Sequence, residues 1–125
     1  TMSEVTTLLQ NYNQGRRDFS GLCLADASLS HVDLKGSDLS YSDLSNVDLS
    51  QANLRGVDLS YAKLSKVDLQ NADLRGAMLI GTDLRDASLQ NTNLKDADYI
   101  PGITRFPNEF DPEQAEMSCI QRHTA

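Results

Sequence analysis

The side chains best suited to catalysis or metal binding are few in this sequence and stand far apart. Its only histidines, His31 and His123, lie towards opposite ends of the chain. No cluster of histidine, cysteine and acidic residues has the spacing of a metal site, and no glycine-rich loop follows a predicted strand. No serine or cysteine has an evident base beside it, as nucleophilic catalysis requires. We therefore expect a protein that is not an enzyme and carries no cofactor or metal.

The charge and hydropathy of the chain limit its partners and its location. The formal net charge of −7 argues against direct nucleic-acid binding, which needs a basic surface. No apolar run is long enough to span a membrane, and no signal-peptide pattern is present. The length of 125 residues fits one domain. Without a targeting segment, we expect the protein in the cytoplasm.

Leucine occupies every fifth position from Leu24 to Leu94, and Phe19 and Tyr99 extend the series in phase. On an α-helix, five residues advance about 500°, so the leucines would spiral around every side. On a flat strand, an odd period sends successive side chains to opposite faces. All of them point inward only if the chain turns a corner every five residues. Four such corners close a square coil of twenty residues.

The positions two before each leucine should also point inward, because side chains alternate along an extended segment. Most of these positions hold small apolar residues, as a narrow interior requires: Ala27, Val32, Val47, Ala52, Val57, Ala62, Val67, Ala72, Ala77 and Ala87. The others hold Ser37, Ser42, Thr82 and Thr92. Their buried hydroxyls are expected to hydrogen-bond to the backbone. A coil filled in this way leaves no interior cavity.

A superperiod of twenty residues supports four repeats per turn. The motif Leu-Lys/Arg-Gly recurs at positions 34, 54 and 74, and Ser-Tyr recurs at 40 and 60. A shift of five residues would break both matches. Cys23 then lies in the first coil and Cys119 beyond the last. Because coils stack about 4.8 Å apart, these cysteines lie beyond disulfide reach, and we expect both thiols to be free.

The A-(D/N)-L-x-x pattern over residues 17–99 resembles the pentapeptide-repeat proteins. This resemblance implies an all-β solenoid, a right-handed quadrilateral β-helix, here with about four coils of 20 residues and short helical caps at both ends. The opening LLQNYNQGRRDFSG and the closing TRFPNEFDPEQAEM are similar to the end segments of cyanobacterial members. The resemblance therefore also implies a small protein of cyanobacterial type.

The chain divides into an N-terminal helical cap (1–15), the repeat β-helix (16–100) and a C-terminal loop and helix cap (101–125). Caps are expected because stacked coils expose unpaired edges at their ends. Residues 3–13 read as a helix with Ser3 as N-cap, ended by Gly15. The sequence Asp111-Pro112-Glu113 reads as a second helix start. Apolar residues expected to cover the last coil are Phe106, Phe110, Ala115 and Ile120.

One side of the predicted coil differs from the others, and we call it the tyrosine face. Its candidate interaction residues are Asp38, Tyr41, Asp58, Tyr61, Met78 and Ile80. Its outward repeat positions hold no lysine or arginine, two tyrosines stack at its corner, and two apolar residues replace an acid and a serine. Such a mixture suits a protein interface. The alternative is a solvated ladder with ordinary surface apolar residues.

A second column carries positive charge: Lys35, Arg55, Arg75 and Lys95. Neighbouring aspartates make a solvated face with local ion pairs one interpretation, and a basic docking stripe the other. For the whole protein we expect a monomeric scaffold or interaction module with an unknown protein partner. The resemblance adds a regulatory role as a possibility, since one cyanobacterial relative regulates heterocyst differentiation. It also brings two alternatives: a DNA mimic that binds a type II topoisomerase, and a purely structural protein.

Overall fold

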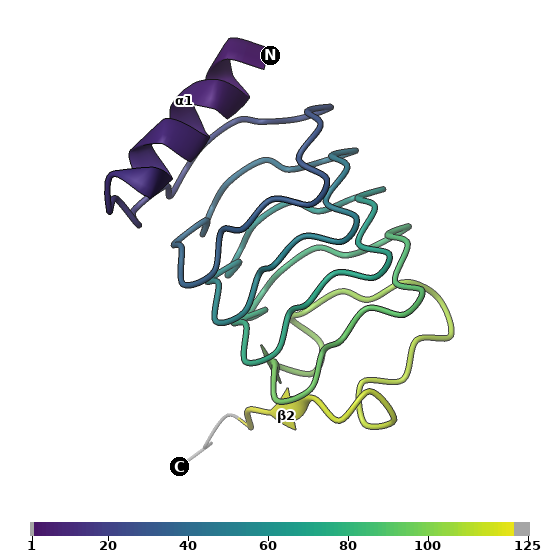
Figure 1. Cartoon of the computed structure of the whole chain (residues 1–125). Coiled ribbons are helices and arrows are strands. Elements are labelled where there is room, and N and C mark those ends of the chain that lie inside the picture. The colour runs from purple at the N-terminus through teal and green to yellow at the C-terminus, as the bar shows by residue number, and fades with distance from the viewer. Residues whose placement is uncertain (1, 122–125) are drawn as a thin grey trace.

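A computed structural model describes residues 2–121 of the chain. It contains helix α1 (Met2–Asn13) and two short strands, β1 (Asp98–Tyr99) and β2 (Ser118–Cys119). Between α1 and β1 the chain winds into a stack of four-sided coils, with α1 against the first coil and β2 at the opposite end (Figure 1). No helix among the described residues is long and apolar enough to cross a membrane.

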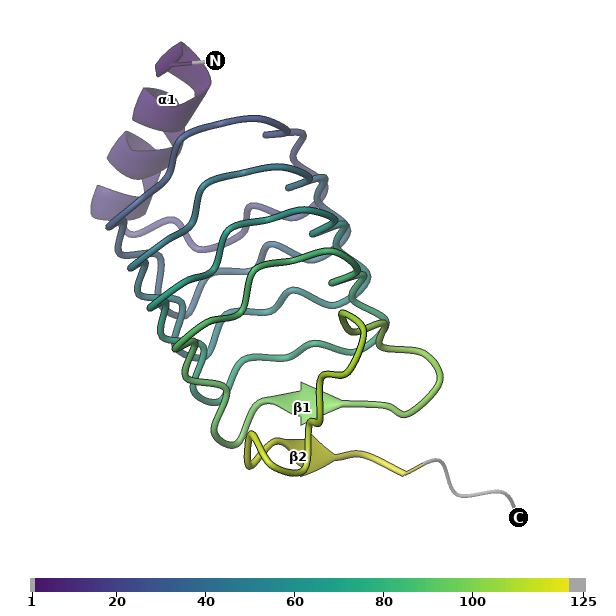
Figure 2. The same cartoon turned by 90° about the vertical axis from the view of Figure 1, so that its right-hand side faces the viewer.

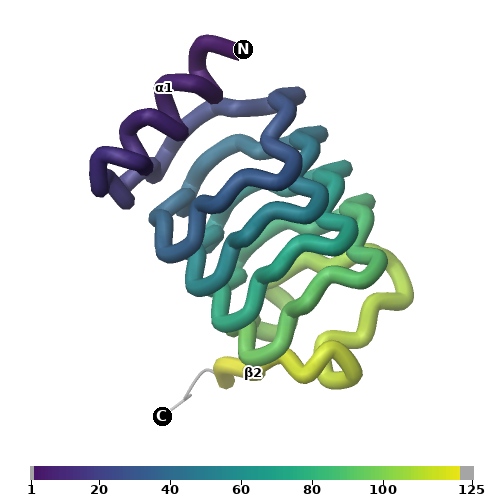
Figure 3. The backbone as a smooth tube through the Cα atoms, viewed as in Figure 1, coloured from purple at the N-terminus to yellow at the C-terminus, as the bar shows by residue number. Residues whose placement is uncertain are grey.

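Successive coils pair through parallel bridges between residues twenty apart. Asp38 pairs with Asp58, and the same offset joins rungs on all four faces. The backbone N–H of every fifth leucine from Leu24 to Leu79 donates to the following coil, as from Leu39 to the carbonyl of Asp58 at 2.8 Å. The coils therefore lie in register, one over the next, as the tube in Figure 3 shows. The predicted twenty-residue turn is confirmed by this spacing.

The corners adopt a left-handed backbone that non-glycine residues enter at some cost. Tyr41 has φ 62° and Asn46 has φ 60°, at the same place in successive repeats. The acid before each leucine supports this corner: Asp48 Oδ1 accepts a 3.0 Å hydrogen bond from the backbone N–H of Ser50. Asn53 accepts from the N–H of Arg55 in the same way at 3.2 Å. Aspartate and asparagine therefore recur because the turn needs a short acceptor side chain.

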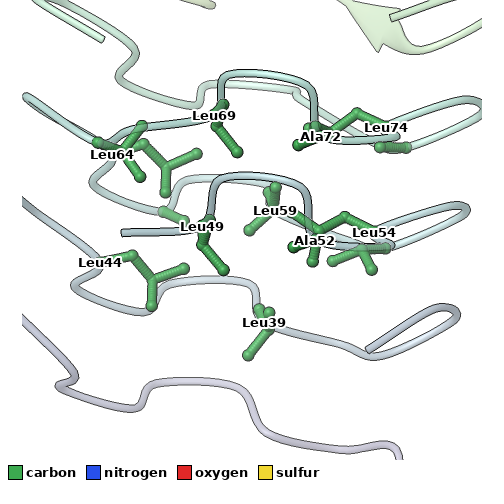
Figure 4. Close-up of a cluster of buried hydrophobic side chains, with 14 of the residues drawn as sticks. Leu39, Leu44, Leu49, Ala52, Leu54, Leu59, Leu64, Leu69, Ala72 and Leu74 are labelled. Carbon is green, nitrogen blue, oxygen red and sulfur yellow. The ribbon is translucent and has the colours of Figure 1, made fainter. Parts of the chain in front are cut away.

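The leucine column fills the interior as predicted. From Leu29 to Leu84 every fifth residue is less than 2% exposed, and the side chains converge inside the coils (Figure 4). Leu89 is only half-buried. Its neighbour Ser88 pairs with Asp68 of the preceding coil, whereas no described residue pairs with Ser88 from the other side. The last coil is therefore covered on some faces and open on others.

Three of the four inward hydroxyls find the backbone partner that was expected. Thr82 and Thr92 donate to the carbonyls of Leu59 and Leu69 at 2.7 Å, and Ser42 donates to the carbonyl of Phe19 at 3.3 Å. Each acceptor lies 23 residues earlier, in the preceding coil. For Ser37 that position is Gln14, which lies beyond the end of α1 and not in a coil. The Ser37 hydroxyl is accordingly buried without a hydrogen-bond partner among residues 2–121.

Replacing Ser37 with alanine is therefore expected to raise the free energy of unfolding by about 1 kcal/mol, because it removes an unsatisfied buried hydroxyl. Alanine fits this column, since Ala77 occupies it two coils later. The matched variant Thr82→Ala should lower stability by about 1 kcal/mol, because it removes a formed hydrogen bond. Urea denaturation followed by circular dichroism measures both. A loss of stability in Ser37→Ala would contradict this account.

Helix α1 lies across the open end of the first coil, with Leu8 and Tyr12 buried against it. The Tyr12 hydroxyl donates to the carbonyl of Lys35 at 2.8 Å. The helix begins at Met2, so Ser3 lies in its first turn and the predicted N-cap at Ser3 is wrong. Gly15, with φ 98°, follows the helix as predicted and lets the chain turn back to the coil.

The predicted C-terminal helix does not form: residues 112–116 make a single turn. The expected start is present, because Asp111 Oδ1 accepts from the N–H of Glu113 at 3.0 Å. Glu116 then takes a left-handed conformation, φ 60°, and Met117 enters the core. Immediately afterwards β2 pairs in parallel with β1 (Figure 2). Strand pairing with the last coil therefore stops the helix after one turn.

The aromatic residues of the C-terminal segment pack together at the end of the stack. The ring centroids of Tyr99 and Phe106 lie 5.6 Å apart, and those of Phe106 and Phe110 4.9 Å apart. Ala115 is half-buried against the core, as expected. Ile120 is 38% exposed, so its predicted covering role is wrong, and Met117 takes that role instead.

Candidate functional site

The six residues of the tyrosine face come together in the structure. Asp38, Asp58 and Met78 are successive rungs of one face, joined by parallel bridges that continue to Asp98. Tyr41, Tyr61 and Ile80 lie at the corner that follows these rungs, in the turn positions of the same coils. The structure thus brings the acids, the aromatic rings and the apolar side chains to one edge of the molecule.

Tyr41 and Tyr61 form a stacked pair at this corner. Their ring centroids are 5.4 Å apart and the ring planes differ by 17°. Tyr41 is 68% exposed and Tyr61 47% exposed. The next residue of the column is Gly81, where any Cβ atom would overlap the ring of Tyr61. Glycine therefore lets this ring lie directly on the backbone of the following coil, a contact that sequence reasoning missed.

The carboxylates of the face also have a structural role. Asp38 Oδ1 accepts from the backbone N–H of Ser40 at 2.9 Å and from its hydroxyl at 2.6 Å. Asp58 Oδ1 accepts from the N–H of Ser60 at 2.9 Å. The recurring Asp-Leu-Ser spacing was a signal of this turn in the sequence. The acids alone therefore do not mark the face as functional.

Met78 and Ile80 replace the acid and the serine of the coils before them, so two apolar groups stand where Asp38 and Ser40 share a hydrogen bond. Met78 is 36% exposed and Ile80 is half-buried. The carbonyl of Ile80 accepts from the backbone N–H of Tyr61 at 2.9 Å. The apolar pair is therefore continuous with the column of corner residues that contains Tyr41, Tyr61 and Gly81, which we call the tyrosine column.

Cations border the other edge of the face. Lys35, Arg55, Arg75 and Lys95 occupy the turns between this face and the preceding one. Arg75 is paired with Asp73 at 2.6 Å, and its hydrogen bond holds the pKa of the Asp73 carboxyl below the usual value. The rung positions lack cations as predicted, yet the corner before them is basic. The face as a whole is thus less acidic than its rungs.

Two clefts flank α1. One, of about 300 Å³, lies between α1 and the first coil and is lined by residues that include Leu8, Arg16, Phe19 and Cys23. The other, of about 510 Å³, lies against the first turns of the helix and Asp26.

In residues 2–121, no group of three or more histidine, cysteine or acidic side chains is placed to hold a metal. His31 is exposed at a corner, and His123 lies outside the described residues. Cys23 and Cys119 are both free, as predicted.

A four-sided stack of five-residue repeats, closed by parallel rungs twenty residues apart, defines the class of quadrilateral β-helix solenoids. The model of the family of pentapeptide repeats matches residues 18–51, 33–71, 52–91 and 68–98, with eight copies. The chain belongs to the pentapeptide-repeat family. The resemblance inferred from the A-(D/N)-L-x-x pattern is thereby confirmed.

Solved structures of cyanobacterial proteins are similar to this chain. The pentapeptide repeat protein alr5209 from Nostoc PCC 7120 is 52% identical, with a TM-score of 0.91 over 93% of this chain and 95% of that one. Rfr23 from Cyanothece 51142 is 32% identical, with a TM-score of 0.49 over 71% of this chain and 63% of that one. The family match and the structure from Nostoc confirm the right-handed quadrilateral β-helix. Among curated proteins, no match was found.

Proposed function

We propose that this protein is a non-enzymatic scaffold that binds a partner protein through the tyrosine face. The observation that carries the proposal is the exposed tyrosine stack beside an apolar pair. Tyr41 and Tyr61 offer large, rigid contact area at low entropy cost. Aromatic residues and methionine are both enriched in protein interfaces. Met78, an exposed methionine on the same face, fits this composition.

The fold itself does not require tyrosine at this corner. Asn46, Gln51 and Lys66 adopt the same left-handed conformation at other corners, with φ between 58° and 60°. A polar side chain would therefore serve the turn equally well. Two large rings held more than 40% exposed are better explained by contact with another molecule than by the needs of the coil.

The DNA-mimic alternative is less well supported. Duplex DNA presents a negative charge about every 1.7 Å along its axis. Here Met78 interrupts the acidic column between Asp58 and Asp98, and a column of cations lines the neighbouring corner. We further propose that the protein is a monomer whose coil stack is closed by α1 and by the C-terminal segment. We propose a regulatory setting, in keeping with the resemblance to cyanobacterial members.

The double variant Tyr41→Ala, Tyr61→Ala is expected to abolish capture of the partner from a cyanobacterial lysate, because it removes most of the contact area. Its melting curve should stay close to that of the natural chain, since neither ring is in the core. The matched control Gln51→Ala, Asn71→Ala alters two exposed corner residues of the same coils and should retain capture. If every captured protein survives loss of both tyrosines, the face is ordinary surface.

The acids can be tested separately. Asp38→Asn with Asp58→Asn should keep the corners intact, because Asn53 already accepts the equivalent hydrogen bond. Capture should weaken mainly at low salt, where charge steering is strongest.

A further inference from the structure

We propose that the partner presents an arginine, whose guanidinium stacks on the open side of the Tyr41 ring between the carboxylates of Asp38 and Asp43. This inference rests on the proposed function of the tyrosine face and specifies its contact. The arginine would bind at one end of the tyrosine column. There the preceding corner residue is Gly21, whose missing side chain leaves open space that we call the notch.

The tyrosine column is closed at one end and open at the other. The Tyr61 ring is covered on one side by Tyr41 and on the other by the backbone of Gly81. Tyr41 stacks on Tyr61, and the preceding corner residue is Gly21, which has no side chain. A Cβ atom built at Gly21 would meet no atom within 4 Å. One side of the Tyr41 ring therefore faces open space, in accord with its 68% exposure.

The charges around this notch favour a cation. The corner of Tyr41 lies between Asp38 on one face and Asp43 on the next, whereas the corner of Tyr61 lies between Asp58 and Lys63. Asp38 Oδ1 is engaged by Ser40, and its Oδ2 atom accepts no hydrogen bond from residues 2–121. One carboxylate oxygen of Asp38, on the rung that precedes the Tyr41 corner, is thus left to accept a hydrogen bond from a partner.

The cations of this protein do not fill the notch. The guanidinium of Arg16 lies 5.2 Å from the Phe19 ring centroid, and that of Arg17 lies 3.7 Å from the Tyr12 ring centroid. Arg16 also donates to the backbone carbonyl of Asp18 at 2.9 Å. Within the described part of the chain, no cation lies over Tyr41. The open side of the Tyr41 ring is therefore accessible to a cation from another molecule.

Arginine suits this arrangement better than lysine. Its planar guanidinium can stack on an aromatic ring while its edge donates to a carboxylate, whereas the ammonium of lysine is a compact point charge. The chemistry at the notch, one open ring with carboxylates on both sides, offers both contacts at once. A basic segment bearing arginine is thus the partner chemistry that this end of the column fits.

The variant Gly21→Tyr tests the stacking directly. Tyrosine tolerates this corner, because Tyr41 and Tyr61 have φ 62° and 59° where Gly21 has φ 71°. A third ring would cover the open side of Tyr41 without removing any existing side chain. The new ring would lie at the corner between Asp18 and Cys23, so a guanidinium stacked on it would lack the second carboxylate. Gly36→Tyr is the matched control: Gly36 has φ 74° at the neighbouring corner, with open space around it.

Fluorescein-labelled hexa-arginine and hexa-lysine peptides, titrated by anisotropy at low salt, supply the probe. We expect hexa-arginine to bind about threefold more tightly than hexa-lysine, as an exposed cation–π contact allows. Gly21→Tyr and Tyr41→Ala should abolish this preference, and Gly36→Tyr should keep it. Equal binding of the two peptides, or a preference that survives in Gly21→Tyr, would overturn the arginine contact.

A negative result in the peptide titration would not contradict the proposed function. The proposed function is tested separately, by capture of the partner with the double variant Tyr41→Ala, Tyr61→Ala. If the double variant loses capture while Gly21→Tyr retains it, the face binds its partner without the arginine stack, and this inference is wrong. If both lose capture and Gly36→Tyr retains it, the inference is supported.

Discussion

Replacing Leu64 with lysine is expected to cost roughly 5 kcal/mol or more, which would unfold most domains of this size. Leu64 is fully buried between the leucines of the coils before and after it. A lysine there would place an ammonium group in an apolar interior without a partner. Circular dichroism should show loss of the cooperative thermal transition.

The control for this variant is Ser65→Lys, one residue along the chain. Ser65 lies at a corner and is half-buried, and Arg85 occupies the same position one coil later with its side chain 58% exposed. A lysine can therefore extend into water there, and the melting temperature should shift by no more than a few degrees. Similar melting temperatures for the two variants would contradict the inward register of the leucine column.

Removal of residues 101–125 is expected to convert the proposed monomer into dimers or larger aggregates. The truncation deletes β2, the buried Met117 and the segment in which Arg105 pairs with Asp83. The rungs of the last coil would then present unpaired backbone groups and exposed apolar side chains, which promote edge-to-edge association. Light scattering after size-exclusion chromatography measures the change.

A chain that ends at Gln121 is the matched control, because it retains β2 and the packed Met117. It should elute at the same mass as the full chain. If the chain that lacks residues 101–125 also stays monomeric at high concentration, the C-terminal segment does not cap the stack.

The interior could be predicted from the sequence because one local rule repeats. Each leucine meets the same surroundings, so the register of Leu39 also holds for Leu59 and Leu79. The surface columns followed from the same arithmetic, which is why the stacking of Tyr41 on Tyr61 was foreseen. In most proteins a single sequence does not reveal which distant residues are in contact. Here the regular repeat does, because residues twenty apart stack on one another.

Where the repeat ends, prediction from the sequence was less successful. Asp111 and Pro112 start a turn as their types indicate, yet the pairing of β2 with β1 ends it at Glu116, and no local signal reports that pairing. Ser37 was expected to find an acceptor, but α1 replaces the coil that would supply it. Both misses come from contacts between the repeat and its non-repeating ends.

The sequence predicted which residues of the tyrosine face lie together, but it did not predict all of their contacts. The sequence placed Tyr61 and Gly81 in one column, but only the structure shows the ring lying on that glycine. The aspartates were interpreted as interface charges, whereas Asp38 also holds its own corner. Side-chain direction at a corner depends on atoms of the next coil, which a one-dimensional pattern does not encode.

The equivalence of the four sides inside the coil has a consequence for insertions and deletions. Five added residues would leave every leucine facing inward, yet they would rotate all later columns by one side. Placed between Tyr41 and Tyr61, such an insertion would move the two rings to different corners and separate them without disturbing the core. Twenty added residues would instead lengthen the rod and keep each column intact. The interior thus tolerates changes in units of five, while the outer surface keeps its pattern only in units of twenty.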